Sequence, residues 1–367
     1  ARFIGVTGSV GKTSTKEALA RALGTLAPTA ASAGSFNNHW GVPLSLARMA
    51  REAVYGVFEL GMNHAGEIRR LGALLRPHVA LITNIEPVHI GLLGSLEAIA
   101  DAKGEIFETM EGDGVAVLNR DNSYFRHLDK VARDQGVRRV IGFGHAADAD
   151  VRLVESTLHA THSHVTAEVA GQRLDYAVAL PGAHWVLNSL AVLAVAHALG
   201  ADTAAFADLE AIKGRGLRRR VGSGRGGFDL IDDSYNANPS SMRAAIAVLG
   251  AAELGPRGRR IAVLGDMLEL GPQAAALHRA LVEPLREAGI DLVFTCGESM
   301  AALAEALPAA VRGTHTTDSR ALTPLVCAAV RAGDVVMVKG SLGSRMGPVV
   351  EALAGLGQAL PRAANGN

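Results

Sequence analysis

The sequence has little cysteine and no excess of either charge. Its 367 residues include two cysteines, Cys296 and Cys327, both in apolar surroundings. We expect buried, reduced thiols, because one distant pair provides neither a disulfide framework nor the ligand set of a metal site. Lys plus Arg and Asp plus Glu both number 36. This balance gives no reason to expect nucleic acid or an anionic membrane as a partner.

Long apolar runs and a leader segment are also lacking. No apolar run reaches the roughly 18 residues that a membrane span needs, and no basic region followed by an apolar stretch opens the sequence. These absences predict a soluble, cytoplasmic protein without membrane insertion, and we expect a monomer. The sequence starts at Ala1 and enters a strand almost at once, so we expect it to be a piece of a longer protein.

The length suits two domains rather than one core. In the first domain, short apolar strands alternate with helical patterns, which is typical of an α/β fold with a mostly parallel sheet. Alternation over 151–180 predicts a small antiparallel addition. The expected strands are 2–6, 55–60, 79–85, 114–118 and 140–143, and the expected helices include 13–23, 96–110 and 184–199.

A basic, glycine-rich stretch at 213–227 is interpreted as the hinge, which places the domains at 1–221 and 222–367. The second domain again alternates strands with helices, and the tail from residue 361 is predicted to be disordered. The expected strands are 228–232, 260–264, 291–295 and 335–338, and the expected helices are 239–249, 273–288 and 299–306.

A glycine-rich turn joins the first strand to the first helix, with the sequence Thr7, Gly8, Ser9, Val10, Gly11, Lys12, Thr13. Such a turn lets backbone N–H groups approach phosphate oxygens at the positive end of a helix. Lys12 would reach the β- and γ-phosphates, and the Thr13 hydroxyl would bind Mg²⁺. The general spacing asks for glycine at position 6, which is Val6, so Gly8 supplies the turn. A chance glycine turn is the alternative, and the loop predicts phosphate binding without naming a reaction.

This variant loop resembles that of the Mur ligases, which build the peptide of the bacterial cell wall. The resemblance runs from about residue 3 to residue 353, and its more specific motifs lie in the second half. The matching segments are 60–67 (LGMNHAGE), 101–107 (DAKGEIF), 232–239 (DDSYNANP), 265–271 (GDMLELG) and 338–341 (VKGS).

The resemblance implies a central P-loop ATPase domain followed by a C-terminal Rossmann-like domain. A further domain that binds the UDP-sugar would precede Ala1, outside this sequence. The implied reaction uses ATP to phosphorylate the carboxylate of a UDP-N-acetylmuramoyl-tripeptide. The amine of D-Ala-D-Ala then displaces phosphate from the acyl phosphate, and domain closure would protect that intermediate from water.

The resemblance also assigns the metal ligands, for two Mg²⁺ ions. Glu59 and Thr13 would bind one ion, His89 would bind the second, and Lys103 would be carbamylated to give an anionic oxygen ligand. The alternatives are a strand-end surface charge for Glu59, a structural histidine for His89 and a solvated helix lysine for Lys103. His64 remains undecided.

For the nucleotide, the resemblance points to Asn188 at the adenine, with His184 beside it, and to Asp233 at the ribose. Trp185 replaces the commoner asparagine there, and an ordinary polar position on an apolar helix is the alternative for Asn188. A hinge arginine should reach the γ-phosphate. We choose Arg218, and a solvated linker is the alternative for it and for its rivals Arg215, Arg219 and Arg220.

The expected substrate contacts lie mostly in the second domain. Tyr235, Asn236 and Asn238 offer donors and acceptors suited to a zwitterionic dipeptide, although Asn238 before proline is also typical of a turn. Lys339 and Ser341 would close over the substrate carboxylate. The remaining candidates lie in the first domain and are Asn37 and Asn38.

Two other functions stay open. A sister ligase would add diaminopimelate, or glutamate to folate, but the chain lacks the Asp-Asn-Pro-Arg motif of the diaminopimelate enzyme, and the Tyr-Asn-Ala-Asn-Pro segment argues against both. A non-catalytic ATP-binding fragment is the second alternative. The presence of Lys12, Thr13, Glu59, His89 and Lys103 argues against that alternative.

Overall fold

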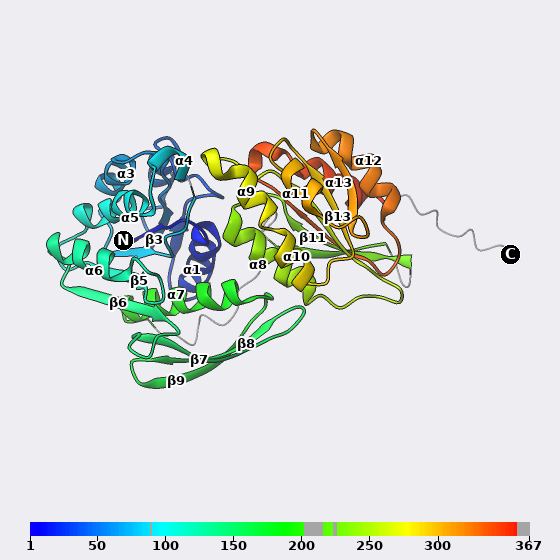
Figure 1. The fold of residues 1–367 in the computed structure, drawn as a ribbon. Coiled ribbons are helices and arrows are strands. Elements are labelled where there is room, and N and C mark those ends of the chain that lie inside the picture. The colour runs from blue at the N-terminus through cyan, green and yellow to red at the C-terminus, as the bar shows by residue number, and fades with distance from the viewer. Residues whose placement is uncertain (89, 202–215, 223–225, 358–367) are drawn as a thin grey trace. The chain divides into compact units, whose positions relative to one another are not determined.

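In the computed structural model, the described residues are 1–88, 90–201, 216–222 and 226–357 (Figure 1). His89, Arg215 and the tail predicted to be disordered lie outside them. The chain divides into two compact units, Ala1–Glu210 and Ala211–Asn367, each with its own sheet. Within the described part of the chain, no helix is long and apolar enough to cross a membrane.

The first unit is built on a nine-stranded sheet in the order β2-β3-β1-β4-β5-β6-β7-β8-β9. The pairs from β2 to β7 are parallel, and β7, β8 and β9 form the antiparallel addition. The predicted fold class is therefore confirmed. The strands are β1 (Arg2–Thr7), β2 (Thr29–Ala31), β3 (Tyr55–Glu59), β4 (Val79–Ile82), β5 (Val115–Asn119), β6 (Arg139–Gly144), β7 (Val151–Leu158), β8 (Ser163–Val169) and β9 (Gln172–Val178).

Helices cover both faces of this sheet, because its central strands are apolar on both sides. One face buries a core with α3, α5 and α6, to which Ile68, Ile99 and Leu128 belong. On the other face α1 and α7 pack against each other and against the strands. The helices are α1 (Lys12–Leu26), α2 (Gly41–Ala47), α3 (Glu67–Leu75), α4 (Ile90–Leu93), α5 (Leu96–Gly104), the 3₁₀ helix η1 (Glu105–Thr109), α6 (Phe125–Asp134) and α7 (Ala183–Leu199).

The second unit has a six-stranded sheet in the order β10-β11-β15-β12-β13-β14, parallel except for the edge strand β10. Side chains along β12 alternate between two cores, with Ala262 and Leu264 on one face and Ile261 and Val263 on the other. The strands are β10 (Leu217–Val221), β11 (Phe228–Asp233), β12 (Arg260–Gly265), β13 (Leu292–Cys296), β14 (Arg312–Thr316) and β15 (Val335–Lys339).

Helices again cover both faces of the second sheet. Residues of α8, α10 and α11 belong to one core, and residues of α12 and α13 belong to the other. The helices are α8 (Pro239–Gly250), η4 (Gly271–Gln273), α9 (Ala274–Arg279), α10 (Val282–Glu287), α11 (Ala301–Ala306), α12 (Ser319–Ala329), η5 (Leu342–Ser344) and α13 (Gly347–Gly355).

The division between the units lies earlier than the predicted boundary at residue 221. Residues 217–221, expected at the end of a hinge, form β10 and pair antiparallel with β11. The pairing uses the backbone groups that a linker would leave in water, and it buries Val221 against Phe228 at its end. A partner strand therefore orders a segment whose composition is that of a linker.

One predicted helix is interrupted in the structure. The segment 273–288 consists of α9 and α10 with a break at Ala280 and Leu281. Pro284 has no N–H to donate to the carbonyl of Ala280, so a continuous helix would lose a hydrogen bond there. The predicted helix 96–110 likewise ends as an α-helix at Gly104 and continues as a 3₁₀ turn.

Candidate functional site

The predicted phosphate loop lies at the carboxyl edge of the first sheet. It joins β1, which runs between β3 and β4, to the start of α1. Parallel strands end at this edge together, so Glu59 at the end of β3 and Thr83 after β4 come close to the loop. Ligands of open α/β sheets bind at this kind of position.

Two glycines of the loop have no room for a side chain. Gly8 has φ 136°, and a Cβ there would lie 1.9 Å from Thr83 Oγ1. Gly11, the N-cap of α1, has φ 83°, and a Cβ there would lie 2.8 Å from Asn188 Oδ1. The loop therefore needs glycine at both positions, as expected for a backbone that must approach an anion closely.

The segment after β4 holds the loop in place. Ser9 N donates to Asn84 O at 3.0 Å, Val10 N donates to Asn84 Oδ1 at 3.0 Å, and Thr83 Oγ1 donates to Val10 O at 2.6 Å. Sequence reasoning missed Thr83 and Asn84. The available signal was a pair of polar residues directly after a buried apolar strand.

The side chain of Lys12 folds back over the loop. Its Nζ donates to Gly8 O at 2.8 Å and to Ser9 O at 3.2 Å. This places an ammonium group beside the backbone turn at the start of α1, where a polyphosphate would lie. The contact of Lys12 with the β- and γ-phosphates stays a prediction.

Thr13 and Glu59, two predicted metal ligands, are in direct contact. Thr13 Oγ1 donates to Glu59 Oε2 at 2.6 Å, and Asn37 Nδ2 donates to Glu59 Oε1 at 2.7 Å. Glu59 is 1% exposed, so a surface charge is the wrong interpretation. The Thr7 hydroxyl nearby in the loop is buried with no hydrogen-bond partner among the described residues. This set of hard oxygen atoms suits Mg²⁺.

Lys103 on α5 is buried, so the alternative of a solvated helix lysine is wrong. Lys103 is 3% exposed, and its Nζ makes no hydrogen bond within the described residues. Burial, and to a smaller extent the positive charge of Lys12, hold the pKa of Lys103 well below its usual value. Burial therefore disfavours the charged form of this amine.

The predicted adenine contact lies on α7. Asn188 Oδ1 lies where it would be 2.8 Å from a Cβ on Gly11, so this side chain borders the phosphate loop. His184 is exposed one turn earlier on the same helix, whereas Trp185 is buried at 4% exposure. The tryptophan that replaces the expected asparagine therefore belongs to the core. Asn38 Oδ1, by contrast, accepts from Trp40 N and Gly41 N, in the turn that leads into α2.

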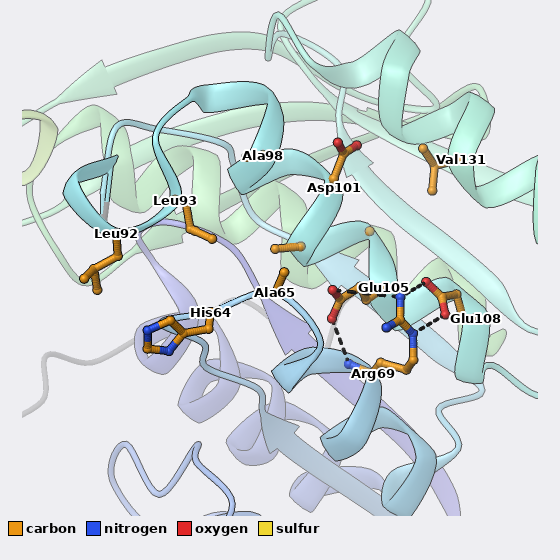
Figure 2. Close-up of a pocket in the computed structure, with 12 residues that line it drawn as sticks. His64, Ala65, Arg69, Leu92, Leu93, Ala98, Asp101, Glu105, Glu108 and Val131 are labelled. Carbon is orange, nitrogen blue, oxygen red and sulfur yellow. Dashed lines mark hydrogen bonds and ion pairs between the residues drawn. The ribbon is translucent and has the colours of Figure 1, made fainter.

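A pocket of about 630 Å³ lies beside two of the matching motifs, 60–67 and 101–107 (Figure 2). Glu105 accepts from Gly66 N at 2.6 Å and from Arg69 N at 3.1 Å, so it caps the start of α3. Arg69 also forms an ion pair with Glu108. His64 also lines the pocket, and its Nδ1 lies 3.6 Å from Glu67 Oε1. Glu105 thus links the segment 101–107 to the segment 60–67 and the start of α3.

In the second unit, three matching motifs follow the neighbouring strands β11, β15 and β12. Lys339 at the end of β15 is 2% exposed. Its Nζ donates to Asp233 Oδ2 at 2.7 Å and to Asn236 O at 2.9 Å. The structure therefore brings together the predicted Asp233, Asn236 and Lys339, with Asn236 on the surface and Tyr235 half-buried.

Ser341 and Asn238 hold the backbone of these motifs. Ser341 Oγ donates to Ala237 O at 3.2 Å and accepts from Leu268 N at 3.0 Å. Asn238 is the N-cap of α8 in a capping box with Ser241. Asn238 therefore has a structural role at the start of a helix, and its contact with a substrate stays a prediction.

Arg218 lies on the edge strand β10 rather than in a solvated linker. Its NH2 group donates to Asp229 Oδ2 at 2.6 Å, and Arg220 NH1 donates to Asp229 Oδ1 at 3.2 Å. Burial raises the pKa of the Asp229 carboxyl, but the hydrogen bonds from the two arginines outweigh it and hold the pKa below its usual value. Arg219 points to the other face and donates to Val350 O.

Comparison with known proteins agrees with this arrangement. The model of the Mur ligase middle domain matches residues 6–196, and that of the Mur ligase, glutamate ligase domain matches residues 214–342. The chain belongs to the Mur ligase family. It is 37% identical to the UDP-N-acetylmuramoyl-tripeptide–D-alanyl-D-alanine ligase of Escherichia coli over 96% of the chain and 77% of that protein.

Solved structures of Mur ligases share the fold. A crystal structure of MurF from Acinetobacter baumannii is 30% identical with a TM-score of 0.85, covering 96% of this chain and 76% of that one. MurF from Thermotoga maritima, solved in complex with ADP, is 26% identical with a TM-score of 0.83, covering 98% of this chain and 80% of that one.

Proposed function

We propose that the chain carries the catalytic part of an ATP-dependent ligase that joins D-Ala-D-Ala to the carboxylate of a UDP-N-acetylmuramoyl-tripeptide in peptidoglycan precursor synthesis. The observation that carries this proposal is the match to relatives with that activity over 96% of the chain, at 37% identity for one of them. The phosphate loop of the first unit and the three motifs of the second supply residues suited to its two half-reactions.

The first half-reaction transfers the γ-phosphate of ATP to the peptide carboxylate, giving ADP and an acyl phosphate. The backbone of residues 8–11 and the Lys12 ammonium would bind the phosphates, and Asn188 would contact the adenine side of the nucleotide. Such transfer depends on positioning and charge neutralisation rather than on a covalent enzyme intermediate. Mg²⁺ held by Thr13 and Glu59 would neutralise charge on the phosphates.

Lys103 would contribute as a carbamate. A neutral, buried amine attacks CO₂ and loses one proton, which converts the side chain into an anionic oxygen ligand. Its burial without a hydrogen-bond partner in the described part of the chain supports this assignment. His89 would complete the metal ligands. We expect Lys103→Ala to lose activity and to regain part of it with short carboxylic acids. Full activity without rescue would contradict the assignment.

The second half-reaction is attack of the dipeptide amine on the acyl carbon, which expels phosphate through a tetrahedral intermediate. Tyr235, Asn236 and Lys339 would bind the dipeptide, while Ser341 and Asn238 hold the backbone around them. Asp233 would bind the ribose and Arg218 the γ-phosphate. Both would then exchange their present partners, Lys339 and Asp229, for the nucleotide.

A phosphate-release assay on the full-length protein tests the proposal. With UDP-N-acetylmuramoyl-tripeptide, ATP and Mg²⁺ present, we expect release to depend on D-Ala-D-Ala and not on diaminopimelate or glutamate. Release that depends on one of these amino acids would support the sister ligase instead. ATP binding without amine-dependent release would support a non-catalytic module.

A further inference from the structure

The tip of the β7–β8 hairpin carries three histidines, far along the chain from the phosphate loop. His159 follows the end of β7, His162 precedes the start of β8, and His164 lies on β8. One ring nitrogen from each lies within 4.8 Å of the other two. Within the described residues, this is the one group of three His, Cys, Asp or Glu side chains placed closely enough to share a metal ion.

The hairpin geometry explains why the rings meet. His159 N donates to His162 O at 2.9 Å, so these two residues face each other across the turn of the hairpin. His164 follows His162 by two positions, and successive side chains of a strand alternate between faces. All three imidazoles therefore project from one face of the hairpin. Ser163, between His162 and His164, and Val165, which follows His164, are buried.

The three imidazole rings are in direct contact with one another. His159 and His162 stack with centroids 4.4 Å apart and 15° between their planes. The ring of His164 stands edge-on to both, at 5.3 Å from His159 and 5.0 Å from His162. Three imidazolium charges at such distances would repel one another, so the arrangement favours neutral rings, which are the form that binds metals.

The surrounding contacts agree with neutral rings. The Thr161 hydroxyl lies 3.2 Å from His162 Nδ1, which fixes the orientation of that ring as outer partners do in metal sites. Among the described residues, no carboxylate forms an ion pair with the three rings, and the Thr161 hydroxyl is the polar group that a metal would meet at His162 Nδ1.

We propose that His159, His162 and His164 form a binding site for Zn²⁺ or a similar transition-metal ion. Imidazole nitrogen suits such borderline ions, unlike the oxygen ligands around Thr13 and Glu59, which suit Mg²⁺. With Zn–N bonds of about 2.0–2.1 Å, two nitrogens on a tetrahedral zinc ion lie about 3.3–3.4 Å apart. The three ring nitrogens lie within 4.8 Å of one another, so the rings would have to rotate towards a common point to bind the ion. Three ligands leave the fourth position to water or to a ligand from outside, and the ion fixes the hairpin tip.

The test is a zinc titration of the metal-stripped protein in excess Mg²⁺, followed by competition with a chromogenic zinc indicator. We expect one zinc ion bound by the parent. His159→Ala, His162→Ala and His164→Ala should each weaken binding by at least the roughly 10- to 100-fold that loss of an outer partner costs. His145→Ala, which removes an exposed imidazole outside the cluster, is the matched control and should bind zinc as the parent does.

Thermal unfolding supplies a second readout that also checks the fold of each variant. Zinc should raise the melting temperature of the parent and of His145→Ala, and should leave the three cluster variants unchanged. No zinc binding by the parent, or equal affinity in parent and cluster variants, would overturn the proposal. Because the readouts are metal binding and stability, their outcome is independent of the ligase activity.

Discussion

Two strand–turn–helix units, one in each half of the molecule (Figure 1), differ in whether a side chain caps the start of the helix. The turn between β1 and α1 ends at Gly11, which offers no side-chain cap among the described residues. The turn between β11 and α8 ends at Asn238, which forms a capping box with Ser241, and Pro239 follows. The first helix thus lacks the side-chain cap that the second has, and a helix N-terminus of that kind is suited to binding an anion.

Two buried lysines repeat this contrast. Lys339 donates hydrogen bonds to Asp233 and to the carbonyl of Asn236. Lys103 is as deeply buried but has no such partner in the described part of the chain. The comparison teaches that a buried cation with acceptors holds the fold together, while a buried amine without acceptors is available for chemistry.

The largest expected effect is on the rate of phosphate release, and it tests the first of the two helix N-termini compared above. Glu59→Gln keeps the size of the side chain but removes the charge that Thr13 and Asn37 contact. Because metal-bound charge stabilisation contributes several kcal/mol, we expect phosphate release to fall by at least about a hundredfold. Glu108→Gln, which changes a carboxylate paired with the exposed Arg69, is the control and should keep the parent rate. Equal rates in both variants would contradict the role of Glu59.

Lys339→Met should change stability instead. It leaves the Asp233 carboxylate, whose side chain is 21% exposed, without its ion-pair partner. We expect a loss of about 2–4 kcal/mol in the free energy of unfolding, measured with denaturant, somewhat less than for a fully buried pair.

Lys130→Met provides the comparison for that loss. The pair of Lys130 with Asp134 is largely exposed, so its removal should change stability by about 0.5 kcal/mol or less. Similar losses in the two variants would mean that burial of Lys339 contributes nothing.

The pH dependence of stability tests the state of Lys103. Its native pKa lies well below 10.5, so between these two values the unfolded chain binds one more proton than the folded chain. The free energy of unfolding should therefore rise with pH in that window, by up to about 1.4 kcal/mol per pH unit from this group. Lys103→Met should have a flatter profile, as measured by denaturant titrations at several pH values. Parallel profiles would show that the amine is charged in the fold.

The smallest effect expected is at the capped helix. Asn238→Ala removes the acceptor for Ser241 N and should cost about 1 kcal/mol of unfolding free energy. Arg243→Ala on the exposed face of α8 should change it by about 0.5 kcal/mol or less. If the two variants unfold alike, the capping box does not close this helix.

Local patterns predicted much of the fold. Short apolar runs between helical patterns gave most strands of both sheets, and the turn before Lys12 and Thr13 gave the phosphate loop. The strand β10 was not predicted, because the stretch 213–227 around it is rich in glycine and arginine and has the composition of a linker. Its order comes from β11 and from Asp229, which lie on another segment.

The site was predictable only in part, for the same reason. Lys103 has no local signal of burial, since its surroundings depend on the packing of α5 against the sheet. The supports of the loop, Thr83 and Asn84, are defined by the pairing of β4 with β1. The spacing of glycine and lysine in the sequence indicates the loop, but it does not indicate which residues contact the loop in the fold.

The most direct test of the account is calorimetric titration of Mg-ADP into the chain and into Lys12→Ala, with Lys130→Ala as the control. If the open N-terminus of α1 is the nucleotide site, Lys12→Ala should lose most of the affinity, and Lys130→Ala should bind as the parent does. Equal affinity of Lys12→Ala and the parent would contradict the account, because the nucleotide phosphates would then lie elsewhere.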